Sequence, residues 1–317
     1  MNNPNNETGQ AQSNSAGAVV KKKTVGNNVA SFGRWFACFL ICFAAYFIVA
    51  TITTIFTMAV HVEGEFSWIP ETLAAFIGFV ILFLISVIVI KKFMKTKFRD
   101  FVFGTKGKFN PKLIGTIFAL WLLGFVIGEF YDLVIKQNPI AINPIGLPSI
   151  LITLVMAIAL TWMQTSYEEI VFRGIPLRAA CGNELKPTVK CVVMGIITSL
   201  LFMTMHLSNP EMLAQSTTVD IIAGAAGYFL MGCMLYFSNV AFGNLMPGLF
   251  IHWINNFYAF AIMTQQVSAM KTGAIFIQDI SPSGVESLLA VLVMYAPIII
   301  FTIVALVNPK VKEKFNS

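Results

Sequence analysis

The chain has 317 residues, of which 57% are hydrophobic and only 11% are charged. Soluble domains carry about 25% charged residues, so the composition excludes an ordinary soluble domain and predicts an integral membrane protein. The formal net charge of +6 comes from basic residues that flank apolar segments. This placement is typical of membrane topology signals, and it gives no indication of a nucleic-acid partner.

The cysteines give no sign of a metal site. They are Cys38, Cys42, Cys181, Cys191 and Cys233. No two of them form a Cys-x-x-Cys pair, and most lie within or at the ends of apolar segments. We therefore expect small apolar helix residues rather than a zinc–thiolate site or a disulfide framework.

Apolar segments of membrane length recur from about residue 31 to residue 309. Before them, residues 1–30 are rich in Asn, Ser, Gly and Gln and predict a disordered polar head. After them, residues 310–317 form a basic tail. The predicted fold is an all-α polytopic membrane protein, a bundle of about eight transmembrane helices. The predicted spans are 34–60, 70–90, 112–135, 148–172, 188–206, 219–237, 243–264 and 286–307, the fourth continuing as a helix towards Cys181.

The positive charges predict the orientation. The head, the second and fourth connections and the tail hold most of the Lys and Arg residues that flank the spans. The alternate connections hold only Lys136 and Lys271, together with several acids. Because cytoplasmic loops carry an excess of Lys and Arg, we expect an even number of spans with both termini in the cytoplasm. In a bacterial cell the membrane would be the plasma membrane.

Two acids and an arginine stand at the end of the fourth span. Glu169 and Arg173 are four residues apart, so they share a helix face and can neutralise each other. Glu168 points about 100° away from Glu169 and lacks that partner. Charge inside a membrane is costly and usually functional, which favours Glu168 as a general base. The alternative is that all three residues form a structural ion network.

The three histidines occupy different settings. His61 lies in an acidic connection and is expected to be a solvated loop residue. His206 ends the fifth span, and Phe202 lies one turn before it. His252 lies in the seventh span, with Asn256 one turn later on the same face. A single intramembrane histidine can be a simple bridge between helices, but two of them near an unpaired glutamate favour a shared site at middle depth.

Three motifs resemble those of the CPBP family. They are Glu-Glu-x-x-x-Arg at 168–173, Phe-x-x-x-His at 202–206 and His-x-x-x-Asn at 252–256. This family comprises the CAAX protease and bacteriocin-processing intramembrane proteases, also called the Abi family, and includes the type II CAAX prenyl endopeptidases. The resemblance covers a core at about 150–260 and implies hydrolysis of a peptide bond in a membrane-associated peptide or protein.

The resemblance also implies a role for each motif residue. Glu168 would activate the attacking water, and His206 would hold and polarise that water. His252 and Asn256 would stabilise the tetrahedral oxyanion. The supporting residues would be Glu169, Arg173 and Phe202.

Cofactor use and function leave alternatives open. We favour a mechanism that needs no cofactor, and no His-Glu-x-x-His motif is present. Zinc or another divalent metal is the alternative, with Glu168, His206 and His252 as ligands and one open position. The expected partners are the bilayer and a peptide or protein substrate. The alternative functions are a non-catalytic immunity or scaffolding protein of the same family and a proton-coupled transporter.

Overall fold

The structure is a computed structural model that describes residues 25–60, 66–104, 108–181, 188–265, 267, 272–278 and 283–316. Residues 1–24 of the predicted head and His61 lie outside these ranges. The first helix already begins at Val25, within the range 1–30 that was expected to be a disordered head. The long helices of the structure are α1 (Val25–Ala59), α2 (Ile69–Lys92), α4 (Pro111–Phe130), α5 (Leu147–Glu169), α7 (Val189–His206), α9 (Thr218–Phe242), α10 (Met246–Phe257) and α11 (Gly284–Val307).

Shorter elements extend or connect these helices. The short helices are α3 (Phe98–Phe103), α6 (Ile175–Cys181), α8 (Pro210–Leu213) and α12 (Pro309–Asn316). Three π-helical turns, which continue α4, α5 and α10, are η1 (Tyr131–Ile135), η2 (Ile170–Gly174) and η3 (Tyr258–Ile262). The strands are β1 (Ile140–Ile142), β2 (Met263–Gln265) and β3 (Phe276–Gln278).

Among the described residues, seven helices are long and apolar enough to cross a membrane, so the chain is an integral, multi-pass membrane protein with an all-α bundle. The expected fourth span continues through η2 and α6 as one helix, Leu147–Cys181. The expected span at 243–264 is shorter than predicted. It consists of the 12 residues of α10 and the 5 residues of η3, fewer than the roughly 20 that a bilayer crossing needs.

The short α10 lies inside the bundle and not at its surface. Gly243 ends α9 in the left-handed conformation with φ of 71°, and the chain turns back into α10 within a few residues. There α10 packs against α5, α9 and α4. A helix surrounded by protein need not match the bilayer thickness, because its ends contact other elements and not lipid.

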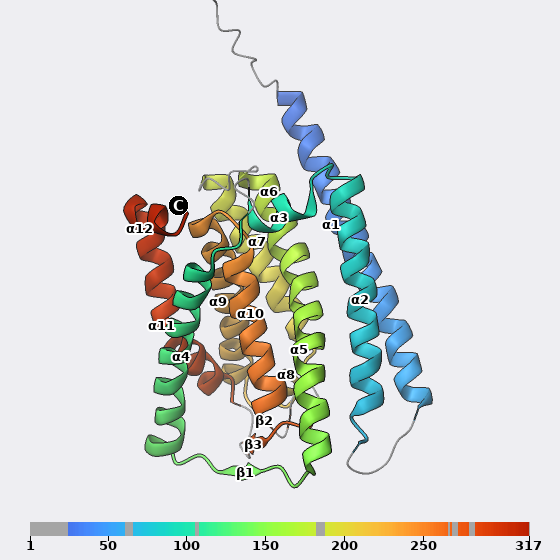
Figure 1. Cartoon of the computed structure of the whole chain (residues 1–317), viewed down its shortest axis with the longest axis vertical. Helices are drawn as coiled ribbons and strands as arrows, with labels where there is room; N and C mark the ends of the chain where they lie inside the picture. The colour runs from blue at the N-terminus through green and yellow to red at the C-terminus, as the bar shows by residue number, and fades with distance from the viewer. Residues whose placement is uncertain are drawn as a thin grey trace, which may run out of the picture.

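The bundle has two distinct ends. The beginning of α1 and the C-terminal α12 lie at one end, which we call the terminal end (Figure 1). A small sheet lies at the opposite end, the sheet end (Figure 1). Its strand order is β1-β3-β2, with β1 antiparallel and β2 parallel to β3. Three-residue strands carry too little alternation to be predicted from sequence.

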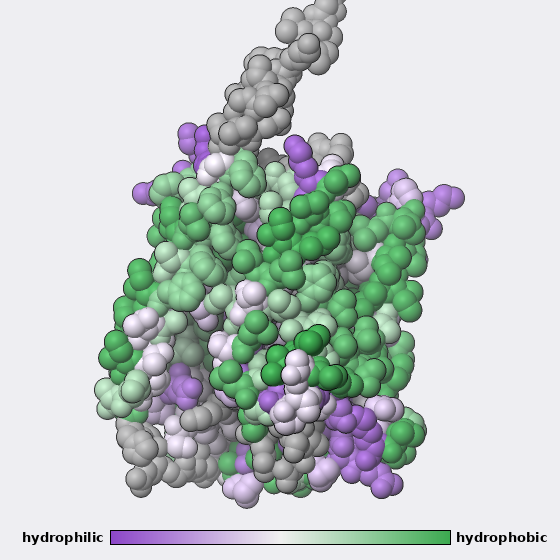
Figure 2. Space-filling model, turned by 180° about the vertical axis from the view of Figure 1, so that it is seen from behind, coloured by the Kyte–Doolittle hydropathy of each residue, from purple (hydrophilic) through white to green (hydrophobic). Residues whose placement is uncertain are grey.

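The surface between the two ends is largely apolar. On the face that Figure 2 shows, hydrophobic side chains cover most of the middle and hydrophilic ones gather near the two ends. Ile48, Val155 and Ile222 are each more than half exposed. Because a continuous apolar belt over membrane-length helices is stabilised by contact with lipid tails, the belt marks the membrane-facing surface.

One expectation about the cysteines needs revision, and the structure adds a helix to the predicted basic tail. Cys181 and Cys191 form a disulfide that joins α6 to α7, so the expectation that no disulfide forms was wrong. The turn between α6 and α7 brings the two Cα atoms to 5.4 Å, which spacing alone does not reveal. Most of the predicted tail forms α12, where the Phe315 ring packs against Phe242 and Phe301 at centroid distances of 6.0 and 5.6 Å.

Candidate active site

The charged cluster lies where α5 passes into η2. Glu169 ends α5, and its Oε1 accepts a hydrogen bond of 2.9 Å from Nη1 of Arg173. Both side chains are buried, with 0% and 1% exposed. The expected pair is therefore present, and each charge has its compensating partner inside the bundle.

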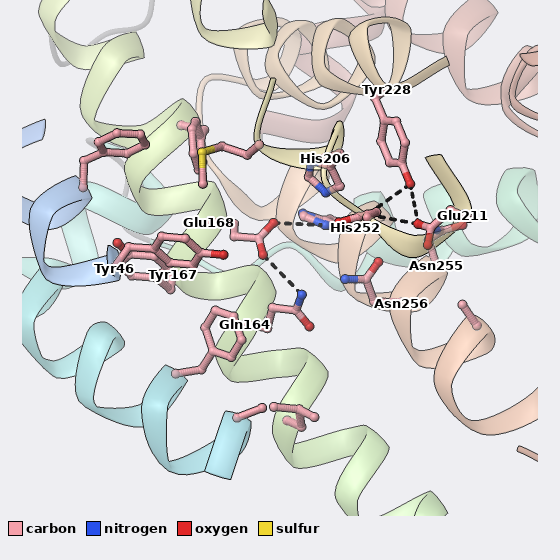
Figure 3. A pocket seen from close by; sticks show the side chains of 18 residues that line it. Tyr46, Gln164, Tyr167, Glu168, His206, Glu211, Tyr228, His252, Asn255 and Asn256 are labelled. Carbon is pink, nitrogen blue, oxygen red and sulfur yellow. Dashed lines mark hydrogen bonds and ion pairs between the residues drawn. The ribbon is translucent and has the colours of Figure 1, made fainter. Parts of the chain in front are cut away.

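His252 of α10 joins this pair. Its Nδ1 lies 2.9 Å from Oε1 of Glu169. A carboxylate only accepts hydrogen bonds, so Nδ1 carries the proton. The other ring nitrogen, Nε2, is then directed at Glu168, whose Oε2 is 3.7 Å away (Figure 3). This contact depends on the packing of α10 on α5, and no sequence spacing indicates it.

Glu168 holds one of its carboxylate oxygens in a hydrogen bond and keeps the other without one. Its Oε1 accepts a hydrogen bond of 3.2 Å from Gln164. Its Oε2 is buried and, within the described residues, has no hydrogen-bond partner. The side chain is 12% exposed, and no described Lys or Arg forms an ion pair with it. Glu168 can therefore accept a proton from a group inside the cavity described below.

His206, at the end of α7, is held by its own helix and by two rings. Its Nδ1 lies 2.7 Å from the carbonyl oxygen of Phe202, which makes Nδ1 the donor and leaves Nε2 free. The imidazole lies between the rings of Phe202 and Tyr228, at centroid distances of 4.3 and 4.5 Å. The Arg173 guanidinium also lies over the Phe202 ring, 4.0 Å from its centroid.

The four residues proposed for catalysis line one cavity. This main cavity has a volume of about 380 Å³, and Glu168, His206, His252 and Asn256 all belong to its wall (Figure 3). A second cavity of about 240 Å³ shares His206, His252 and Asn256. Helices from distant parts of the chain thus bring a carboxylate, two imidazoles and an amide to one place.

Other polar residues at this place were not predicted. Tyr228 of α9 donates a 2.7 Å hydrogen bond to Oε1 of Glu211, which also accepts one of 3.0 Å from Asn209. Asn255 accepts a hydrogen bond from Tyr295. In the sequence, Glu211 is only one of several acids in a connection. Its place soon after His206 was the one available signal.

The geometry does not provide the alternative metal site. Each histidine donates from Nδ1 and presents Nε2, as metal-binding histidines do. Among the described residues, however, no group of three His, Cys, Asp or Glu side chains could hold a metal ion. Glu168, His206 and His252 thus do not fit as a ligand set in this arrangement, and no metal-dependent step follows from it.

The main cavity extends towards the sheet end. Asn209 and Glu211, in the connection between α7 and α9, belong to its wall, and α8 lies in the half of the bundle nearer the sheet (Figure 1). In the other direction, every residue from Glu169 to Arg178 is buried. The site is therefore closed towards the terminal end.

Comparison with known proteins agrees with this arrangement. Residues 149–258 match the family described as "Type II CAAX prenyl endopeptidase Rce1-like", whose members are proteases. A relative in Bacillus subtilis (strain 168), "Uncharacterized protein YyaK", is 25% identical over 175 residues, which cover 55% of this chain and 55% of the relative. The similarity thus spans about half the length of each protein.

No solved structure matches the chain. The matched residues 149–258 include all three motifs and the four residues proposed for catalysis, which line the main cavity. Residues 149–258 therefore match an Rce1-like domain, which is consistent with the resemblance to the CPBP family.

Proposed function

We propose that the protein is an intramembrane endopeptidase that hydrolyses a peptide bond of a membrane-associated peptide or protein. The observation that carries this proposal is the buried, unpartnered Oε2 of Glu168 in the wall of a cavity that also contains two imidazoles and an amide. A carboxylate placed in this way can take a proton from water, and an ionisable group inside a membrane bundle usually has a functional role of this kind.

In the proposed reaction, water binds between Glu168 and His206. Glu168 removes a proton as the water oxygen attacks the carbonyl carbon of the substrate. The Asn256 amide donates a hydrogen bond to the oxyanion, and the His252 ring helps to stabilise it. Glu168 then returns the proton to the amine nitrogen as the C–N bond breaks, so the carboxylate is regenerated and no metal or redox cofactor is needed.

Glu169 and Arg173 support this chemistry by holding His252. The hydrogen bond from Nδ1 to Glu169 fixes the orientation and the tautomer of the ring, as the acid does in a serine protease triad. Arg173 neutralises the remaining charge of Glu169. Phe202 lies against His206 and His252, the latter at 5.8 Å between ring centroids, and limits the rotation of both.

Cleavage by purified protein in lipid nanodiscs tests this proposal. With a pool of synthetic membrane peptides as substrate, Glu168→Gln should lower the cleavage rate about 10²–10⁴-fold, the contribution of a general base. Glu129→Gln is the matched control, because Glu129 is another partly buried glutamate that binds Tyr258 and lies outside both cavities.

Equal cleavage by the wild type and by Glu168→Gln would exclude Glu168 as the base. If the wild type cleaved no peptide and its cellular role survived Glu168→Gln and His206→Ala, the non-catalytic immunity or scaffolding function would replace the protease. Proton flux in proteoliposomes would instead support the transporter.

A further inference from the structure

Glu211 lies where the main and second cavities meet, and it takes no part in the proposed reaction. It belongs to the walls of both cavities. Its Oε1 already accepts hydrogen bonds from Tyr228 and Asn209. Its Oε2 is buried and has no hydrogen-bond partner among the described residues. One oxygen is thus held in place, and the other is left for a group that enters the cavities.

The surroundings of Glu211 are negatively charged. Glu168 and Glu211 both line the main cavity, and no Lys or Arg belongs to the described wall of either cavity. Arg173 is engaged with Glu169 and does not reach the wall. A buried carboxylate without a counter-ion is unfavourable in a medium of low dielectric constant. A cation that binds there would remove this penalty.

The second cavity restricts the shape of such a cation. Apart from Glu211 and the shared site residues, its wall has an apolar part that includes Met212, Met231, Val291 and Met294 and a polar part that includes Gln215, Asn255 and Ser287. Methionine side chains adapt to unbranched apolar groups. A lysine or arginine side chain matches both parts of this wall, because its methylene stem packs on apolar surface while its charged group reaches the carboxylate.

We propose that Glu211 is a specificity-determining residue that binds the cationic side chain of a lysine or arginine next to the scissile bond. His206, His252 and Asn256 lie in the wall that the two cavities share, so a side chain in the second cavity belongs to a residue close to the attacked carbonyl. This role in cleavage rests on the proposed protease function, whereas the binding of the cation does not.

The test compares two synthetic peptides in nanodiscs with the full-length protein. Both are apolar membrane peptides of the same sequence, with either one lysine or one norleucine at a scanned position. The wild type should bind the best lysine peptide about 10–100-fold more tightly than its norleucine counterpart, the range of a hydrogen bond between charged groups. Cleavage of the two series is measured in parallel by mass spectrometry.

Glu211→Gln isolates the effect of the negative charge, because the amide oxygen can still accept the hydrogen bonds from Tyr228 and Asn209. This variant should lose the preference for lysine in binding and, where cleavage occurs, in the ratio of kcat/KM. Tyr228→Phe is the matched control, since it removes one donor to Glu211 but keeps the carboxylate, and it should retain the preference.

Each result decides between the proposals. Equal binding of both peptides by the wild type at every scanned position would overturn the role of Glu211, and so would an unchanged preference in Glu211→Gln. Cleavage without any lysine preference would leave the protease standing and remove the specificity proposal. Preferential binding of lysine without cleavage would support Glu211 as a cation site and count against the protease.

Discussion

At the scale of single residues, Glu169 connects the ion pair to the imidazole. One oxygen atom serves both Arg173 and His252. The sequence indicated the first contact through the four-residue spacing but not the second. The two adjacent glutamates consequently have different proposed tasks, Glu168 in proton transfer and Glu169 in orientation.

The buried pair makes single substitutions costly. Arg173→Met leaves Glu169 charged and enclosed, so we expect it to lower the free energy of unfolding by about 3–5 kcal/mol. The double variant Glu169→Gln, Arg173→Met should recover part of this loss, because both charges are then removed. Thermal unfolding in detergent measures the effect. Additive losses in the double variant would contradict the pairing.

The proposed oxyanion role of Asn256 gives a kinetic prediction. Asn256→Ala should lower kcat about 10²–10³-fold with little change in KM, because the lost hydrogen bond forms mainly in the transition state. Asn308→Ala, an asparagine at the end of α11 and outside both cavities, is the control. A rise in KM at unchanged kcat would instead assign Asn256 to substrate binding.

Whether cleavage depends on a divalent metal can be decided by removing such metals from the protein. We expect protein depleted of divalent metals by stringent chelation to keep its full cleavage rate, because the reaction proposed for Glu168 uses only side chains. Elemental analysis of the same sample confirms the depletion. Loss of cleavage that returns when zinc is added would establish metal dependence and require a rearrangement of Glu168, His206 and His252.

At the scale of elements, sequence patterns located the long helices but not their ends. Membrane-length apolar segments predicted seven of the spans within a few residues, because lipid exposure leaves a strong apolar signal. The length of α10 was overestimated, because a helix buried in protein can be as apolar as a helix in lipid. The strands and the disulfide depend on contacts between distant segments, which local patterns do not encode.

The motif residues were easier to find than their neighbours. Spacing of four along a helix places two side chains together whatever the tertiary fold, and all three motifs have this spacing. The bond between Glu169 and His252 and the stacking of Tyr228 on His206 require helices to be docked. In the sequence, only its place soon after His206 marked Glu211, and nothing separated Tyr228 from other polar residues.

Close helix packing supplies a prediction for α4 and α11. A Cβ atom on Gly124 would lie 1.8 Å from the carbonyl oxygen of Met294, so the two backbones need glycine there. Gly124→Ala should lower the free energy of unfolding by about 1–3 kcal/mol. Gly115→Ala in the same helix, where a Cβ would meet nothing within 4 Å, should leave it nearly unchanged. Equal stability of both variants would contradict this packing.

At the scale of the whole molecule, the two ends of the bundle differ in charge. The described lysines and arginines of the connection between α2 and α4 lie at the terminal end, as do those of α12 (Figure 1). The proposed site is closed in this direction. If this end faces the cytoplasm, the main cavity opens on the opposite side. A substrate would then reach the site from outside the cytoplasm, which disfavours prenylated cytoplasmic proteins.

Single cysteines at the two ends test this orientation. Leu213→Cys places an exposed thiol in α8, in the half of the bundle nearer the sheet, and Lys310→Cys places one in α12 at the terminal end (Figure 1). In intact bacterial cells a membrane-impermeant maleimide should label Leu213→Cys, whereas Lys310→Cys should react only after the cells are opened. The opposite pattern would reverse the orientation and turn the cavity towards the cytoplasm.

The disulfide offers a second, independent measurement of the same property. Cys181 and Cys191 lie at the terminal end, and the cytoplasm keeps most cysteines reduced. With this end inside, both should be trapped as free thiols when cells are lysed in an alkylating reagent, and should form the disulfide only after purification in air. A pair that is already oxidised in the cell would place the terminal end outside, since the disulfide then forms where oxidation is normal.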